Sequence, residues 1–501
     1  LLRCKTLRDL SVLHAMIKAS WDAASRSEVT LRTHMPQTHL TGAVHAAVEA
    51  PRPEWLERPV DVNALAPDLW SATVSRRESG ELQVGGLGVT EILKQSGGSP
   101  VYVMDEEDFR SRARAFKEAF EGWDVYYASK AFTCRAVVRW AAEEGLRVDV
   151  CSLGELRVAL DAGVDPALIG HHGNNKSEAE LEYAVTHGVG RIVVDSLAEI
   201  SRLADICERL DKRANVMVRV TAGVKAHTHE HIATAHEDQK FGFSITNGQA
   251  MVAMVRCHAN PHLDLRGIHS HIGSQIFGTS GFEIATRRTM KLLSQFAGAT
   301  DTELPELDLG GGFGIRYTTQ DHPATPKTLA AGLREIVTHE ARGYQLQVPQ
   351  MSIEPGRAIV GPSMLALYTV GTIKPVDLDG GQQRVYVSVD GGMSDNLRPA
   401  LYGADYSATL ASRSSEASPV LCRIVGMHCE SGDILVNDEF MPSDLCAGDV
   451  IAVPASGAYS RVLASNYNYT PRPGVVAVGG GKLRWLIRRE SLEDVLAFDV
   501  S

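Results

Sequence analysis

The stretch DVYYASKAFTCRAVVRWAAEEGLRVDVCS, residues 124–152, decides the fold class. It begins with an apolar and aromatic segment, Asp124–Ser129, and ends with a second segment of strand-forming residues, Val148–Ser152. Between them, residues 136–145 (AVVRWAAEEG) place apolar and polar side chains with the period of an amphipathic helix. A strand followed by a helix and another strand is typical of a fold with a parallel sheet.

The same alternation continues through the middle of the chain. Further strands are expected at Ile169–Gly173, Arg191–Ser196, Val216–Thr221, Leu265–Ile272, Glu306–Gly310 and Met351–Glu354. Eight strands with helical connections over about 250 residues match an α/β fold of the (β/α)8 barrel type. We assign the barrel to residues 105–368, while a doubly wound sheet stays an alternative because periodicity does not show closure.

The ends of the chain differ from the barrel. After about residue 370 helical patterns nearly vanish, and short strands separated by Gly, Asp and Pro turns predict an all-β domain at 369–501. Residues 61–104 carry strand signals that could add strands to that domain. Residues 1–60 are expected to form a poorly ordered extension.

Composition excludes several classes of protein. The 501 residues carry 50 basic and 61 acidic side chains, a net charge of −11, and no basic stripe that would bind nucleic acid. No apolar run approaches the roughly 18 residues that a membrane span needs. The eight cysteines form no CxxC pair, which argues against a structural zinc site, and they are too sparse in 501 residues for a disulfide framework. A cytoplasmic protein is expected.

Lys130 ends an apolar strand, where a charged amine is costly unless it is paired, solvated or chemically used. The other strand ends carry HHGNNKS (171–177), HSHIGSQ (269–275), DLGGGFG (308–314) and IEPGR (353–357). Together they offer an amine for a Schiff base, a glycine cradle for a phosphate, an imidazole for an aromatic ring and a carboxylate for a pyridine nitrogen. This set describes pyridoxal 5′-phosphate.

Each motif alone has a plainer interpretation. The glycines of GGGFG could form only a tight turn, and a lone histidine such as His271 is more often a core residue. Glu354 and Arg357 could simply pair with each other. Co-location at one end of a barrel favours the cofactor.

Nine motifs taken together resemble one family. They are YASKAF (127–132), DVCSLGEL (149–156), HGNNKS (172–177), HSHIGSQI (269–276), LGGGFG (309–314), EPGRAIVG (354–361), VDGGMSDNLRPALYGA (389–404), CESGD (429–433) and ASNYN (464–468). Their order and spacing, from about residue 65 to the end, are similar to diaminopimelate decarboxylase, a pyridoxal-phosphate enzyme with the alanine racemase-like fold. The resemblance implies conversion of meso-2,6-diaminopimelate to L-lysine and CO2, the last step of lysine biosynthesis.

The resemblance also implies a role for each matching position. It assigns the cofactor to Lys130, which would form the Schiff base, and to His271, Gly273, Ser274, Gly312, Glu354, Pro355, Gly356, Arg357 and Tyr459. It assigns the substrate to Arg357, Arg398, Tyr402, Glu430 and Tyr459.

Catalysis would rest on Lys130 and on Cys429 as proton donor. In this family Cys429 and Glu430 would enter the active site of a second subunit, which implies a homodimer with shared sites. Two arginines and a tyrosine suit the far carboxylate of the substrate, whereas an ornithine-type decarboxylase would need an acidic group for a bare amine.

Competing functions remain. The nearest is a related ornithine- or arginine-type decarboxylase. Alanine racemase would want an arginine in place of Glu354, and a non-catalytic relative would usually lose Lys130 or Cys429. A metal-dependent hydrolase would use the cluster of His227, His229, His231 and His236, but its spacing is not HExxH, and no bound metal is expected. Ala235 and Leu463 depart from the family pattern only mildly.

Overall fold

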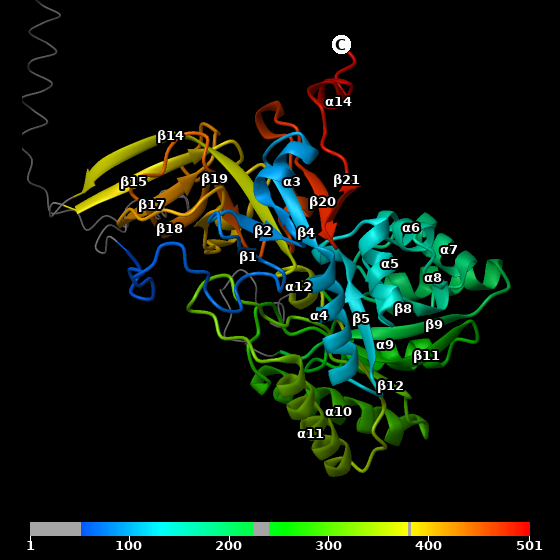
Figure 1. Ribbon diagram of the computed structural model, residues 1–501. Helices are drawn as coiled ribbons and strands as arrows, with labels where there is room; N and C mark the ends of the chain where they lie inside the picture. The colour runs from blue at the N-terminus through cyan, green and yellow to red at the C-terminus, as the bar shows by residue number, and fades with distance from the viewer. Residues whose placement is uncertain (1–51, 224–239, 379–381) are drawn as a thin grey trace, which may run out of the picture. The chain divides into compact units, whose positions relative to one another are not determined.

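The computed structural model describes residues 52–223, 240–378 and 382–501 (Figure 1). These residues belong to one compact unit, Ala50–Ser501. Most of the predicted N-terminal extension, the four-histidine cluster and Ala235 lie outside the described residues.

Among the described residues, eight parallel strands close into a barrel. They are β5 (Asp124–Ala128), β6 (Arg147–Val150), β7 (Ile169–His171), β8 (Arg191–Val194), β9 (Ala214–Thr221), β11 (Leu263–Ser270), β12 (Glu306–Asp308) and β13 (Gln350–Ile353). Closure comes from the pairing of β13 with β5, where Ile353 lies opposite Val125. The predicted barrel is confirmed, and the doubly wound alternative is wrong.

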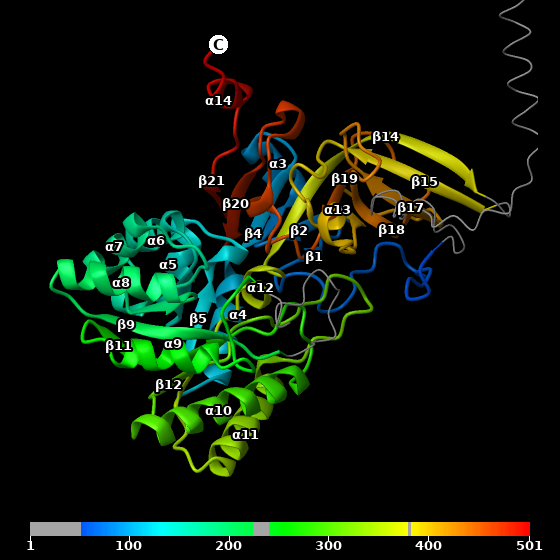
Figure 2. The same cartoon turned by 180° about the vertical axis from the view of Figure 1, so that it is seen from behind.

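Helices cover the outside of the barrel. α4 (Glu106–Ala119) precedes β5, and between the barrel strands lie α5 (Arg135–Glu143), α6 (Leu153–Asp161), α7 (Glu178–His187), α8 (Leu197–Arg209), α9 (Gln249–His258), α10 (Ser280–Thr300) and α11 (Pro326–Gly343). Figures 1 and 2 show α5 to α8 along the outer face of the first strands. Ser152, Ser177 and Ser196 each follow a barrel strand and cap the next helix by accepting a backbone N–H.

A separate β-sheet domain follows the barrel. Its strands are β14 (Met364–Leu378), β15 (Gln382–Val389), β16 (Thr409–Leu410), β17 (Pro419–Val425), β18 (Ile434–Pro442), β19 (Val450–Val453), β20 (Gly474–Gly479) and β21 (Lys482–Ile487). The sheet order is β18-β17-β15-β14-β4-β20-β21. The long strand β14 runs through the boundary that we drew at residue 368.

One strand of this sheet comes from the N-terminal side of the barrel. β4 (Val101–Asp105) is antiparallel to β14 and parallel to β20, and all five of its residues are buried. Three shorter strands, β1 (Ser75–Arg76), β2 (Leu82–Val84) and β3 (Leu87–Gly88), form a small sheet of their own. The β domain is therefore built from two distant parts of the chain.

The interior of the β domain holds an aspartate. Asp395 is 2% exposed; its carboxylate accepts hydrogen bonds from the Tyr368 hydroxyl at 2.6 Å and from the Gly392 N–H at 2.7 Å. Burial raises the pKa of Asp395 to about 7, despite these hydrogen bonds.

A pH effect on stability follows from Asp395. Because its pKa is higher in the folded than in the unfolded protein, this carboxyl stabilises the fold at acidic pH, and that contribution is lost as the pH rises from about 4 through 7. We expect Asp395→Asn to remove this pH-dependent loss of stability. The difference in melting temperature, variant minus parent, should be more positive at pH 8 than at pH 5 in thermal scans. An equal difference at both pH values would contradict a raised pKa.

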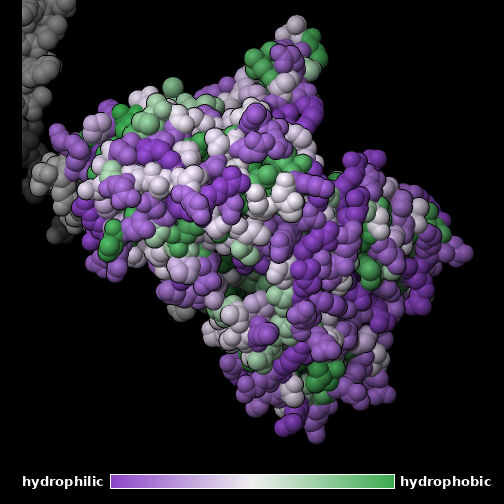
Figure 3. Space-filling view, viewed as in Figure 1, coloured by the Kyte–Doolittle hydropathy of each residue, from purple (hydrophilic) through white to green (hydrophobic). Residues whose placement is uncertain are grey.

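One face of the molecule is mostly hydrophilic. Figure 3 shows hydrophilic side chains over most of one face, with apolar residues scattered among them. No helix of the described residues is both long and apolar enough to cross a membrane.

Candidate active site

A pocket lies at the carboxyl ends of the barrel strands. Its empty volume is about 410 Å3, part of which is open to solvent. The lining side chains and backbone come from Ala128, Lys130, His271, Gly273, Ser274, Gly311, Gly312, Phe313, Glu354, Gly356, Arg357 and Tyr459. Within the described part of the chain, the structure thus brings together every predicted cofactor position except Pro355.

Lys130 stands in a short 3-10 turn, Ser129–Ala131, directly after β5. Its amine opens into the pocket. Asp149 lies on the neighbouring strand β6, where it is paired in register with Ala128. Burial alone would lower the pKa of Lys130, but the negative charge of Asp149 raises it above the ordinary value. The strand-end lysine is therefore held as a cation when no other group occupies its amine.

Two glycine-rich loops form one side of the pocket. The loop after β11 and the loop after β12 are joined by hydrogen bonds from Ile276 N to Gly312 O and from Gly314 N to Ile276 O. Gly312 has a φ of +106°, and a Cβ at this position would lie 2.3 Å from the carbonyl oxygen of Gly273. Only glycine fits there, because a side chain would push the loops apart.

Two arginines meet beside the pocket. Arg357, which begins α12 (Arg357–Val360), donates to the Ser274 hydroxyl at 2.7 Å and to the Tyr317 hydroxyl at 2.6 Å. Arg398, which begins α13 (Arg398–Tyr402), is 3% exposed and stacks 4.5 Å above the Tyr317 ring. Tyr317 therefore joins the two guanidinium groups that we predicted for a carboxylate.

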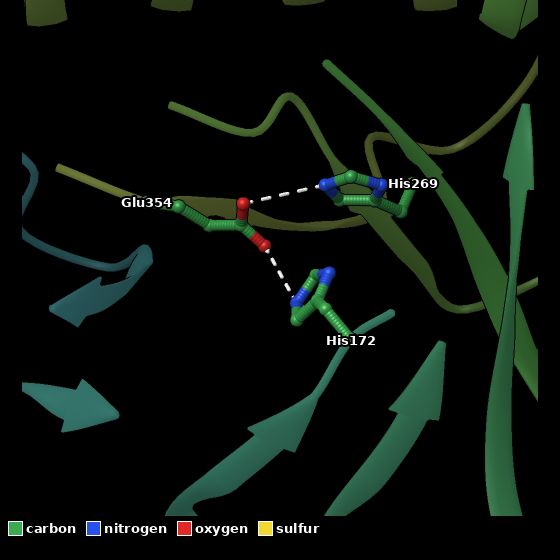
Figure 4. Close-up of side chains that lie close together, drawn as sticks. All are labelled: His172, His269 and Glu354. Atoms are coloured by element: carbon green, nitrogen blue, oxygen red, sulfur yellow. Dashed lines mark hydrogen bonds and ion pairs between the residues drawn. The ribbon is translucent and has the colours of Figure 1, made fainter. Parts of the chain in front are cut away.

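Glu354 is buried at the carboxyl end of β13 between two imidazoles (Figure 4). Its two carboxylate oxygens lie 3.0 Å from His172 Nε2 and 3.3 Å from His269 Nε2. Burial alone would raise the pKa of Glu354, but the two imidazoles lower it well below the ordinary value. Burial lowers the pKa of His172 to about 3, so this imidazole is neutral and can act as a hydrogen-bond donor.

Tyr459 has a strained backbone. Its φ of +60° is a genuine outlier for an aromatic residue, and its N–H donates to Ala131 O at 2.9 Å. The ring lies 4.7 Å from the Arg357 guanidinium. Strain of this kind persists where surrounding contacts impose it, often at functional sites. The contact ties a β-domain loop to the turn that carries Lys130.

Five predicted residues do not line this pocket: Arg398, described above, and Pro355, Tyr402, Cys429 and Glu430. Cys429 and Glu430 are exposed on the loop between β17 and β18, where Glu430 accepts a hydrogen bond from the Tyr467 hydroxyl at 2.8 Å. Tyr402 is half-buried at the end of α13. Pro355 does not line the pocket, but its carbonyl oxygen accepts from Ala128 N at 3.3 Å beneath it.

The side chains present fit pyridoxal phosphate. An amine, a buried ionised carboxylate and a glycine cradle surround one pocket. In addition, His271 Nδ1 is buried with no hydrogen-bond partner in the described residues. Burial also lowers the pKa of His271 well below its ordinary value, so the ring is neutral. A neutral imidazole can lie against an aromatic ring without placing a charge there.

Comparison with known proteins agrees with this chemistry. The family described as "Pyridoxal-dependent decarboxylase, pyridoxal binding domain" matches residues 106–361. A diaminopimelate decarboxylase of Mycobacterium tuberculosis is 51% identical over 441 residues, which cover 87% of this chain and 98% of that protein. The chain belongs to the diaminopimelate decarboxylase family.

Other relatives give the same result. The diaminopimelate decarboxylase of Mycobacterium leprae is 48% identical over 469 residues, covering 92% of this chain and 99% of that protein. The crystal structure of diaminopimelate decarboxylase from M. jannaschii in complex with L-lysine has a TM-score of 0.79 and 29% identity, and the match covers 86% of this chain and 98% of that one. As a diaminopimelate decarboxylase, the chain is a pyridoxal-phosphate-dependent lyase.

Sequence reasoning missed several residues of this decarboxylase. His172 and His269 were visible as the second histidine of HHG and the first of HSH, but nothing in the sequence showed that both would reach Glu354. Tyr317, which joins the two arginines, lies in no motif that we used. Such contacts depend on which strands become neighbours when the barrel closes.

Proposed function

We propose that the protein removes CO2 from meso-2,6-diaminopimelate to give L-lysine, with Lys130, Glu354 and Cys429 as the residues that act on the reacting end. The pairing of Arg357 and Arg398 around Tyr317, next to the Lys130 pocket, is the observation that carries the choice of substrate. A substrate with two amino-acid ends needs one end held while the other reacts.

The cofactor would be held at both of its ends. Lys130 would bind the aldehyde through its amine, the loops of Gly273 and Gly312 would take the phosphate, and Glu354 would face the ring nitrogen. When bound, pyridoxal phosphate supplies a cationic ring that accepts the electron pair left by departing CO2. Glu354 supports this by keeping the ring nitrogen protonated, since its own pKa is low enough to stay anionic.

The remaining groups would act on the substrate. Arg357 and Arg398 would hold the far carboxylate, for which planar guanidinium groups are well suited. Tyr402 would complete this anchor, Tyr459 would contact both cofactor and substrate, and Glu430 would bind the far amino group. Cys429 would deliver a proton to the α-carbon, so that the product leaves as L-lysine.

We expect Arg398→Met to weaken substrate binding more than turnover. A lost hydrogen bond to a charged group costs about 1.5–3 kcal/mol, so KM for meso-diaminopimelate should rise about 10- to 100-fold with a smaller change in kcat. Steady-state assays of lysine release measure both constants. Arg423→Met is the matched control, because Arg423 is also buried but donates to Asn437 O within the β domain. A KM that does not change in Arg398→Met would contradict the anchor.

The choice between substrates is tested directly. Purified enzyme should release CO2 from meso-diaminopimelate and much less from ornithine or arginine. Release from ornithine alone would replace our proposal with the related basic amino-acid decarboxylase. The same purified enzyme should be analysed for bound metal ions, because potential ligand atoms of His172, His269 and Glu354 lie within 4.8 Å of one another.

A homodimer with shared sites belongs to the proposal. It is supported by the exposure of Cys429 and Glu430, which stand apart from their own chain's pocket. A proton donor in that position could serve the active site of a second copy. A cytoplasmic location is also proposed; it is supported by the free state of all seven cysteines in the described residues.

A further inference from the structure

A buried arginine lies inside the barrel below the pocket. Arg191 is the first residue of β8 and is 3% exposed. Its guanidinium reaches across the barrel: Nη1 donates to Ser352 Oγ on β13 at 3.0 Å, and Nη2 forms an ion pair with Asp308 on β12. The same Nη2 lies 3.7 Å from Glu354 Oε1. One cation therefore contacts three residues from neighbouring strands.

Tyr126 and Gly170 also hold the Arg191 side chain in place. The guanidinium lies 3.9 Å from the centre of the Tyr126 ring, a cation–π contact. A Cβ on Gly170 would come within 3.3 Å of both Arg191 Nε and the Tyr126 ring, so glycine leaves the room that the pair occupies. A charge at this depth is tolerated only with good geometry and several partners, which Arg191 has.

These contacts lead to the two loops that would hold opposite ends of the cofactor. Asp308 uses its other oxygen, Oδ1, to accept from Gly310 N at 2.7 Å, and Gly310 begins the glycine loop. The carbonyl oxygen of Gly310 in turn accepts from Glu354 N at 3.0 Å. Arg191 thus contacts the carboxylate proposed for the ring nitrogen and, through Asp308, the loop proposed for the phosphate.

We propose that Arg191 is a positioning residue that fixes the distance between Glu354 and the Gly310–Gly314 loop, and so sets the affinity for pyridoxal phosphate. The cofactor is a rigid ring with its nitrogen and its phosphate on different sides, so both groups must be held at one spacing. Arg191 touches neither the cofactor nor the substrate. The inference rests on the proposed cofactor contacts of the preceding section.

A purely structural role would give a different result. If Arg191 only fills the barrel interior, its loss lowers stability and leaves the cofactor affinity of the folded protein unchanged. Arg147 offers a matched control, because it begins β6 in the same way and lies 5.7 Å from the same Tyr126 ring. It pairs with Asp124 at 2.9 Å on the outer rim and contacts neither Asp308 nor Glu354.

The experiment titrates cofactor-free enzyme with pyridoxal phosphate and, separately, with pyridoxal, which lacks the phosphate. Absorbance and intrinsic fluorescence report binding, and thermal scans of the cofactor-free proteins report folding. Arg191→Met is the main variant. Arg191→Lys keeps the charge without the planar fork and serves if the first variant does not fold.

For Arg191→Met we expect the Kd for pyridoxal phosphate to rise about 10- to 100-fold, as when groups that orient the ligands of a bound species are lost. The Kd for pyridoxal should rise less, because one of the two held ends is absent. Arg191→Lys should fall between parent and Arg191→Met, and Arg147→Met should change either Kd by less than about twofold.

Two results would overturn the proposal. One is a lower melting temperature with both Kd values unchanged, which would leave Arg191 a structural residue. The other is an unchanged Kd for pyridoxal, which would mean that the contact between Arg191 and Glu354 does not affect binding of the ring. Neither result depends on which amino acid the enzyme decarboxylates. If the proposed substrate is wrong, the protein will bind the cofactor but will not release lysine from meso-diaminopimelate.

Discussion

Lys130→Ala is expected to lower kcat for meso-diaminopimelate by at least about 1,000-fold, because the variant loses both the covalent hold on the cofactor and a group that can move protons there. The protein should still fold, since the Lys130 side chain opens into the pocket and not into the core. Borohydride reduction followed by peptide mapping measures the covalent link. The parent should carry reduced cofactor on Lys130 and on no other lysine.

The exposed Lys94 on α3 (Val89–Ser96) provides the control, as its replacement by alanine should leave both activity and the adduct unchanged. Undiminished turnover by Lys130→Ala would refute the assignment of the reacting amine. An adduct on a different lysine would do the same.

Cys429→Ala is expected to lower kcat by about 100- to 10,000-fold, the usual range for loss of a positioned proton donor. The thiol lies on the β17–β18 loop and does not line the pocket of its own chain. Cofactor binding should therefore be close to that of the parent, which separates this variant from Lys130→Ala. The exposed Cys446 is the matched control: Cys446→Ala should keep full activity.

The two variants also test whether sites are shared. When Lys130→Ala and Cys429→Ala chains are mixed and allowed to exchange, a hybrid dimer has one site with both residues intact. Random pairing then restores about a quarter of the parental activity. No recovery despite exchange shown by mass spectrometry would mean that each chain supplies its own cysteine.

Much of the fold could be predicted because the barrel strands carry a local signal. Segments such as Val148–Ser152 are short, β-branched and separated by amphipathic helices, and the structure places strands there with ends shifted by one or two residues. Polar residues at strand ends were also predictable, since parallel strands bring their carboxyl ends to one edge. Lys130 and Glu354 were found in this way.

Long-range contacts were not predictable by the same reasoning. Arg191 lies at the amino end of a strand and was counted only as part of it, yet it reaches β12 and β13 across the barrel. Tyr317 follows the glycine loop without any spacing that ties it to Arg398. Such partners are set by barrel closure and by packing of the β domain, which a local pattern does not encode.

The central place of β4 bears on how the chain is synthesised. The barrel strands, residues 124–353, can assemble while the ribosome is still translating, but β4 must wait for β14 on one edge and for β20, residues 474–479, on the other. Before β14 is made, this buried five-residue strand has two open edges, and before β20 is made it still has one, the kind of edge that recruits neighbouring chains. Premature termination even shortly before residue 474 would thus yield a nearly complete polypeptide that is prone to aggregate.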